Sequence, residues 1–194
     1  METLSKIFGS ETKVKVMRLF LFNPDRVYSM TQIAERSKAD IGRVRREVSN
    51  LEKMGMIKRR TIVKNKVSKL GFVVNPQFSY LSSLQNFLVN VEPLNSKEII
   101  RRISKLGSIK FLVISGVFIQ MLESRIDILV VGDNIKKGSL ENTIKTLESE
   151  IGKELKYAYF STEDFKYRHG MFDKLIRDIL DYPHKKIVNK LGIL

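Results

Sequence analysis

The stretch SMTQIAERSKADIGRVRREVSNLEKMGMIKRR, residues 29–60, decides the fold of the first part of the chain. Ser29, followed three residues later by Gln32, has the pattern of a capping box, which satisfies free backbone N–H groups at a helix start. Asp40 is a typical N-cap for a second helix, and Gly55 supplies the left-handed residue that ends it. Apolar residues recur at helical spacing between them, at Ile41, Val44, Val48 and Leu51. The stretch therefore predicts two short helices joined by a tight turn.

The face of the second predicted helix that lies opposite its apolar stripe is basic and has no carboxylate. At about 100° per residue this face carries Gly42, Arg43, Arg46, Ser49, Asn50 and Lys53. Arg and Asn are side chains that bond base edges in the major groove, and Arg and Lys also bond phosphates. A solvated helix surface is the alternative. The preceding helix at turn distance and the basic continuation at Lys58, Arg59 and Arg60 favour DNA binding.

This segment resembles the winged helix-turn-helix of small transcriptional regulators, whose pattern Leu51, Gly55 and Ile57 match. Strands are predicted at residues 57–63 and 67–74, with a turn at 64–66, and this hairpin would be the wing. A helix at 10–22 would complete the bundle. Double-stranded DNA is the partner that the resemblance implies. The residues expected to contact it are Ser29, Lys38, Arg43, Arg45, Arg46, Asn50, Lys53, Lys58, Arg59, Lys64 and Lys66.

The charge of the chain agrees with a nucleic-acid partner. Its 194 residues include 35 Lys and Arg against 21 Asp and Glu, a net charge of +14. Residues 1–75 hold 17 basic and 7 acidic side chains, so most of the excess lies in the first part. The absence of cysteine excludes disulfides, thiol catalysis and zinc sites of the Cys type. With no signal peptide and no apolar run long enough for a bilayer, we expect a cytoplasmic protein without a membrane partner.

The rest of the chain divides into a linker and a second domain. We expect a winged helix domain at residues 1–76, a linker helix at 77–95 and the second domain at 96–194. The linker stripe of Phe78, Leu81, Leu84 and Leu88 could pack on its own domain or on a second subunit. Helices are predicted at 96–106, with Ser96 as cap, at 139–151 and at 162–181, the last interrupted near His169. Strands between them, from the runs 109–119, 125–131 and 155–161, argue a layered α/β arrangement.

Residues 112–133, LVISGVFIQMLESRIDILVVGD, resemble the start of a minimal nucleotidyltransferase domain. That family has a Gly-Ser turn followed by a strand that bears Asp-x-Asp. Gly116 matches the turn and Asp127 one aspartate, but Val117 replaces the serine and Arg125 the first metal-binding aspartate. Two-metal chemistry needs paired carboxylates, and a guanidinium at a ligand position repels cations. We therefore expect an ion pair between Arg125 and Asp127 in a vestigial site, with no metal, no cofactor and no catalysis.

The fold class expected from these features is α+β, with an N-terminal winged helix-turn-helix and a C-terminal α/β nucleotidyltransferase-like domain with a mixed sheet. The expected function is that of a sequence-specific DNA-binding transcriptional regulator. Its catalytically dead second domain would serve dimerisation, a nucleotide-like effector or a protein partner. The alternatives are a divergent nucleotidyltransferase that acts on nucleic acid or protein, and a toxin-antitoxin type interaction module. Apolar stripes at 78–88 and 172–180, with Ile187, Val188 and Leu191 beyond, lead us to expect a homodimer.

Overall fold

The computed structural model describes residues 2–64, 67–89, 94–121 and 124–193, without the side chains of residues 2, 62–64 and 67. Helices account for 52% and strands for 20%, which confirms a mixed α+β protein. The chain forms two compact units. The first comprises Met1–Val91 and Lys145–Lys153, and the second comprises Glu92–Ile144 and Glu154–Leu194.

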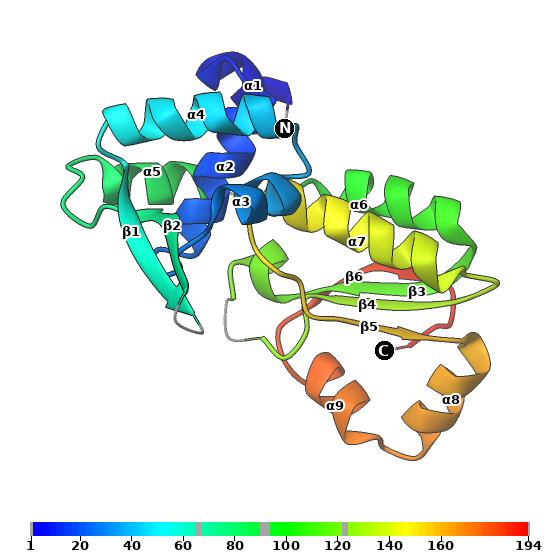
Figure 1. The fold of residues 1–194 in the computed structure, drawn as a ribbon. Helices are drawn as coiled ribbons and strands as arrows, with labels where there is room; N and C mark the ends of the chain where they lie inside the picture. The colour runs from blue at the N-terminus through cyan, green and yellow to red at the C-terminus, as the bar shows by residue number, and fades with distance from the viewer. Residues whose placement is uncertain (1, 65–66, 90–93, 122–123, 194) are drawn as a thin grey trace. The chain divides into compact units, whose positions relative to one another are not determined.

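The first unit contains five helices and a two-stranded hairpin among its described residues (Figure 1). The helices are α1 Glu2–Phe8, α2 Glu11–Phe22, α3 Met30–Ser37, α4 Ile41–Lys53 and α5 Leu81–Leu88. The antiparallel hairpin consists of β1 Ile57–Lys64 and β2 Val67–Val74. An isolated antiparallel β-bridge between Tyr28 and Phe72 connects the segment before α3 to β2.

The caps predicted for α3 and α4 are confirmed. Ser29 and Gln32 form both hydrogen bonds of a capping box at the start of α3. Asp40 Oδ1 accepts the N–H groups of Gly42 and Arg43 at the start of α4. Gly55 has a φ of +76°, the left-handed conformation that ends α4 at little steric cost for glycine. These local signals therefore fix the pair of helices where the sequence places them.

Helix α5 packs on the core of its own unit. Leu88 is fully buried there, and Phe78, Leu81 and Leu84 pack against the same cluster, which α2, α3 and α4 also form. This stripe was expected to pack either on its own domain or on a second subunit. In the structure it packs within its own unit. The stripe therefore belongs to the hydrophobic core that stabilises this unit.

A buried arginine and the end of α7 (Lys137–Ile151) complete the first unit. Arg18 is only 2% exposed, and its guanidinium donates to the carbonyl oxygens of Leu88 at 3.2 Å and Glu150 at 2.9 Å. Burial lowers the pKa of this guanidinium. Gly152, with a φ of +89°, lies so close to α2 that a Cβ would come within 2.5 Å of the Arg18 carbonyl carbon. Residues 145–153 therefore pack as part of the first unit.

The second unit is built on a mixed four-stranded sheet, as expected. Its strand order is β5 (Tyr157–Phe160), β4 (Ile128–Asp133), β3 (Ser108–Ile114) and β6 (Lys185–Asn189). β4 and β5 are parallel, whereas β3 is antiparallel to both β4 and β6. Of the apolar residues after Pro183 that were expected to extend a helical surface, Ile187 and Val188 instead lie in the edge strand β6, and Leu191 packs against the core of this unit.

Helices cover both faces of this sheet (Figure 1). α6 (Ser96–Ile103) and the first part of α7 lie on one face, and α8 (Thr162–Gly170) and α9 (Lys174–Leu180) lie on the other. Short 3-10 helices, η1 (Ser104–Leu106) and η2 (Gly116–Ile119), flank β3. A core cluster lies beneath α8 and α9, and its fully buried members are Phe111, Val131 and Phe165.

Two details of the second unit differ from the sequence prediction. The side chain of Asn95, rather than that of Ser96, caps α6 by accepting the Lys97 N–H at 3.0 Å. Phe172 lies in the break between α8 and α9, with a φ of +54° and an exposure of 76%, so it is not part of a buried helix stripe. Both differences arise at helix ends, where boundaries inferred from periodicity are least certain.

Candidate nucleic-acid interface

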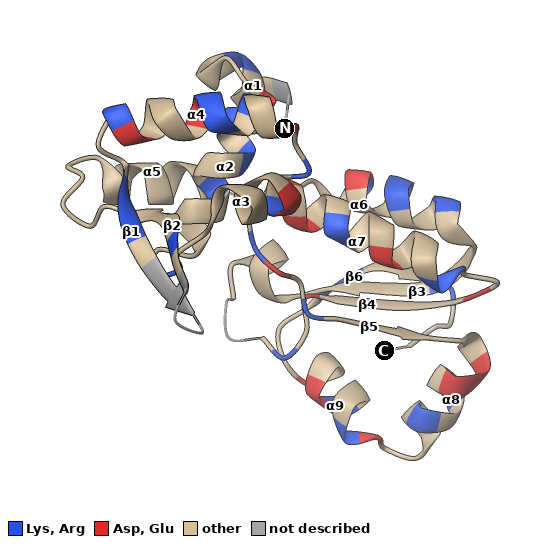
Figure 2. Ribbon diagram, viewed as in Figure 1, with Lys and Arg blue, Asp and Glu red and all other residues tan. Residues whose placement is uncertain are grey.

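Helix α4 presents the basic face that its sequence predicts. Val44, Val48 and Leu51 are buried in the core of the first unit. Arg43, Arg45, Arg46 and Lys53 are exposed on the other side, and Asn50 is half-buried. Among the described residues, none forms an ion pair with the guanidinium groups of Arg43, Arg45 and Arg46. Figure 2 shows basic positions along α4 and at the start of β1. This face therefore has its hydrogen-bond donors available to a ligand.

Two residues expected to contact DNA lie at the two ends of α3. At its start, the Ser29 hydroxyl accepts the Gln32 N–H at 3.3 Å and lies 2.9 Å from the Thr31 hydroxyl. At its end, Lys38 adopts a φ of 48°, and its Nζ donates to Thr146 Oγ1 at 2.9 Å within the first unit. Ser29 therefore caps α3, and Lys38 connects the turn before α4 to α7.

At the base of the hairpin, Lys58, Arg59 and Arg60 are all exposed. Arg59 forms a bidentate ion pair with Glu52 on α4, with Nε–Oε1 at 2.6 Å and Nη2–Oε2 at 3.2 Å. This hydrogen bond raises the pKa of Arg59. Side chains alternate along a strand, so Lys58 and Arg60 point to the opposite face from Arg59. Neither has an ion-pair partner in the described part of the chain.

Two of the lysines predicted to contact DNA, Lys64 and Lys66, lie at the hairpin tip. The side chain of Lys64 and the whole of Lys66 lie outside the described residues.

Glu52 is the interface residue that sequence reasoning missed. Its partner follows seven positions later on another element, and helical spacing cannot indicate a pair that joins the end of α4 to β1.

In the second unit the structure brings Gly116 and Asp127 together. Asp127 is 5% exposed, and its two carboxylate oxygens accept the N–H groups of Val117 at 2.9 Å and Lys156 at 2.8 Å. Gly116 has a φ of +57°, and a Cβ there would collide with Asp127 Oδ1. The carboxylate therefore ties three segments together: the turn after β3, the approach to β4 and the approach to β5.

The predicted ion pair between Arg125 and Asp127 is wrong. Both residues precede β4, so strand alternation does not apply to them. Arg125 Nε instead contacts Asp178 Oδ2 on α9 at 2.8 Å. This ion pair lines a pocket of about 730 Å³, to which Lys174, Tyr182, Met121 and Ser124 also contribute. No cluster of three or more His, Cys, Asp or Glu side chains suited to a metal occurs in the described part of the protein.

Comparisons of the chain with protein-family models, with curated proteins and with solved structures find no match. Across the described residues, none of the helices combines the length and apolar character needed to cross a membrane.

Proposed function

We propose that this protein is a sequence-specific transcriptional regulator that binds double-stranded DNA through its first unit, used as a winged helix-turn-helix. The observation that supports this proposal is the face of α4, where Arg43, Arg45 and Arg46 are exposed and have no ion-pair partner among the residues that the structure describes. The same unit exposes Lys58 and Arg60 at the base of the hairpin. The opposite side of α4 packs in the hydrophobic core of the unit, so the basic side chains are held on a rigid support.

In this proposal α4 enters the major groove and the hairpin follows the phosphate backbone. Arg43 and Arg46 suit guanine edges, and Asn50 suits an adenine edge, each such bidentate contact contributing about 1–3 kcal/mol of discrimination. Lys58 and Arg60 meet phosphates whatever the bases are, and Lys64 and Lys66 are proposed to do the same. Arg59, held by Glu52, contributes less than its position in the sequence suggests.

The second unit is proposed to be a nucleotidyltransferase-like domain without catalytic activity. Asp127 uses both carboxylate oxygens to accept backbone N–H groups, and Arg125 stands where the resemblance requires a metal-binding aspartate. The pocket is lined by the Arg125–Asp178 ion pair, Lys174 and Tyr182, and the ammonium of Lys174 suits the anionic group of a nucleotide-like effector. We therefore propose that this unit serves effector binding or dimerisation rather than catalysis.

The DNA-binding proposal is tested by selecting bound fragments from a random duplex pool and then measuring affinities by fluorescence anisotropy. Arg46→Ala should weaken binding to the selected site about 5- to 150-fold, the factor for 1–3 kcal/mol, and change binding to random duplex much less. Lys105→Ala is the matched control, because it removes one charge from an exposed site of the second unit. Equal losses on both DNAs for Arg46→Ala would make α4 a non-specific clamp.

The phosphate contacts are tested by salt titration on the same two DNAs. Lys58→Ala combined with Arg60→Ala should weaken both complexes alike. It should also lower the slope of log affinity against log salt by up to about 1.8, since each phosphate contact accounts for roughly 0.9. An unchanged slope would remove the hairpin base from the interface.

The absence of catalysis is tested with labelled nucleoside triphosphates, Mg²⁺ or Mn²⁺ and candidate nucleic-acid or protein acceptors. The wild-type chain and Asp127→Asn should incorporate the same background of label. Label that depends on both the metal and Asp127 would establish the chain as a divergent nucleotidyltransferase instead.

A further inference from the structure

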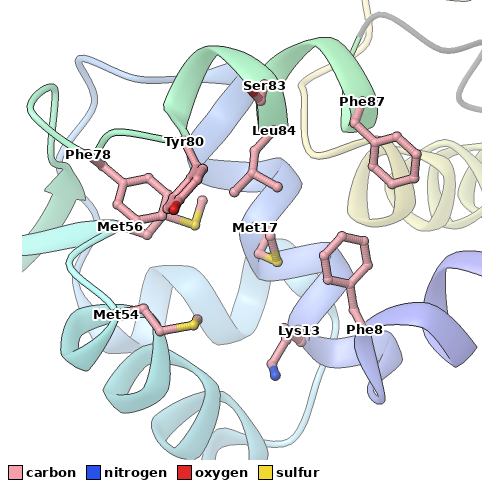
Figure 3. Close-up of a pocket in the computed structure, with 10 residues that line it drawn as sticks. All are labelled: Phe8, Lys13, Met17, Met54, Met56, Phe78, Tyr80, Ser83, Leu84 and Phe87. Carbon is pink, nitrogen blue, oxygen red and sulfur yellow. The ribbon is translucent and has the colours of Figure 1, made fainter.

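The first unit contains an apolar pocket of about 470 Å³ (Figure 3). It lies among α1, α2, α5, the end of α4 and the start of β1. The lining residues are Phe8, Lys13, Met17, Met54, Met56, Phe78, Tyr80, Ser83, Leu84 and Phe87. Its volume falls within the range of about 300–1,000 Å³ that small-molecule sites occupy.

Of the ten described lining residues, four are aromatic and three are methionines. Phe8 and Phe87 lie with ring centroids 6.2 Å apart, and Phe78 and Tyr80 with centroids 5.8 Å apart. Figure 3 places these two pairs on opposite sides of the pocket, with Met17 between them. Aromatic faces favour a planar apolar molecule, and methionine side chains adapt to its outline.

Several of these apolar side chains are left in contact with water. Met54 is 53% exposed, Tyr80 67% and Phe87 46%. Removing apolar surface from water is worth about 25 cal/mol per Å². A molecule that covers these side chains therefore gains binding free energy that the unit does not use for its own folding.

Lys13 is the one charged side chain among the described residues of the lining. Its ammonium lies 3.9 Å from Glu47 Oε2, which is too long for a hydrogen bond, and its side chain is 24% exposed. Glu47 Oε2 is buried and accepts no hydrogen bond from the described residues. The ammonium therefore has donors available to a group placed in the pocket. An anionic oxygen is the group that it would bond most strongly.

We propose that this pocket binds a small amphipathic molecule with a planar apolar body and one anionic group, of the aromatic carboxylate or sulfonate class. A single cation in the lining suits one negative charge rather than a polyphosphate. The site does not depend on the proposed DNA-binding function, because none of its lining residues is among those proposed to contact DNA.

The test uses two fluorescent probes that share one ring system. 8-Anilinonaphthalene-1-sulfonate carries the anionic group, and N-phenyl-1-naphthylamine lacks it. Both should bind the full-length chain with one site. Ser83→Trp, which places an indole into the pocket, should abolish binding of both probes. Ser82→Trp is the matched control, since Ser82 is an exposed neighbour on α5 outside the lining, and it should bind both probes as the wild type does.

The anionic group is tested at Lys13. Lys13→Gln should weaken binding of the sulfonate about tenfold, the factor for one charge-assisted hydrogen bond, and leave the neutral probe within about twofold. Glu47→Gln should tighten sulfonate binding, because it removes a nearby negative charge and releases Lys13. The double variant Lys13→Gln with Glu47→Gln avoids an unpaired buried carboxylate, and it should show the same loss of sulfonate binding at an unchanged melting temperature.

Two results would overturn the proposal. Equal binding of both probes to the Ser83→Trp and Ser82→Trp variants would place the probes elsewhere on the chain. If the double variant lost the same affinity for the sulfonate as for the neutral probe, the pocket would not select for an anionic group.

Discussion

At the scale of single residues, the ion pair between Glu52 and Arg59 neutralises part of the positive charge at the hairpin base. Both nitrogen–oxygen contacts of the pair are short, and Glu52 comes from the helix that we propose to lie in the groove. In the proposed complex, a carboxylate at this edge would also repel the phosphate backbone. We therefore infer that Glu52 moderates non-specific affinity, whereas Arg43 and Arg46 have no ion-pair partner in the described part of the chain.

We expect Glu52→Gln to raise affinity for random duplex and to steepen its salt dependence. The slope should increase by up to about 0.9, because one released guanidinium can make one more phosphate contact. The measurement is a salt titration of DNA affinity. Glu141→Gln makes the same charge change in the second unit, and a gain as large as that of Glu52→Gln would contradict a local effect.

Asp127→Asn should destabilise the second unit by about 2–3 kcal/mol. The buried carboxylate accepts two backbone N–H groups, and an asparagine offers one acceptor oxygen and turns an NH₂ group toward the other donor. Urea unfolding followed by circular dichroism measures this change. Asp181→Asn serves as the control, because Asp181 is exposed and its contact with Arg177 is 3.6 Å long. A loss no larger than that of the control would show that the bonds of Asp127 contribute little.

Residues whose roles depend on near neighbours were predictable from the sequence, and residues with distant partners were not. Ser29, Asp40 and Gly55 act within a few positions, where capping and backbone preferences apply directly. Arg125 pairs with a residue of another helix, and Arg18 bonds carbonyl groups at the ends of two helices. Tertiary packing determines which residues form such pairs, and the spacing of residues along the chain does not indicate them.

At the scale of elements, periodic segments were predicted well and short edge segments poorly. The hairpin β1–β2, helix α4 and the break between α8 and α9 all follow from apolar spacing and turn residues. β6 was missed because its five residues, KKIVN, include two lysines and two adjacent apolar residues, so no alternation of apolar and polar residues indicates a strand. The basic face of α4 was predictable for the same reason as the helix itself, whereas the bond from β1 to Glu52 required the fold.

The contact between α7 and α2 leads to a stability prediction. Gly152→Ala should lower the free energy of unfolding by at least about 2 kcal/mol, because alanine resists a positive φ and its Cβ would meet the backbone of Arg18 and Leu19. Gly138→Ala, in the first turn of the same helix, has no atom within 4 Å of the added Cβ. This control should change stability by less than about 1 kcal/mol, in the stabilising direction.

Urea denaturation of the two glycine variants compares them directly. If Gly152→Ala unfolds at the same urea concentration as Gly138→Ala, the close approach of α7 to α2 does not contribute to the stability of the first unit.

At the scale of the whole molecule, we propose self-association through the exposed apolar side chains around the break between α8 and α9. Tyr167 is 68% exposed, Met171 66% and Phe172 76%. Burying such side chains between two copies would remove apolar surface from water. The apolar stripe on α5 packs in the core of the first unit, so the second unit is the better candidate for a dimer interface.

Sedimentation velocity at micromolar concentration should report twice the chain mass of 22.4 kDa. Met171→Asp combined with Phe172→Asp should shift the protein to the monomer without lowering its melting temperature, since both side chains are exposed. Ile7→Asp, at a side chain 61% exposed in the first unit, should leave the dimer intact. A wild-type chain that sediments as a monomer would refute the interface.

The bonds from Arg18 to Leu88 and Glu150 also have a consequence for the order in which the protein is made. Glu150 follows Arg18 by 132 residues, so a ribosome that adds roughly 5–20 residues per second needs roughly 7–26 seconds between them. Between Leu88 and Glu150, which are 62 residues apart, the nascent first unit has its helices α1–α5 and its hairpin but lacks the segment that packs on α2. The part of the chain that emerges first is therefore completed late, and a gene fragment that ends after α5 would encode a unit with an unfinished core.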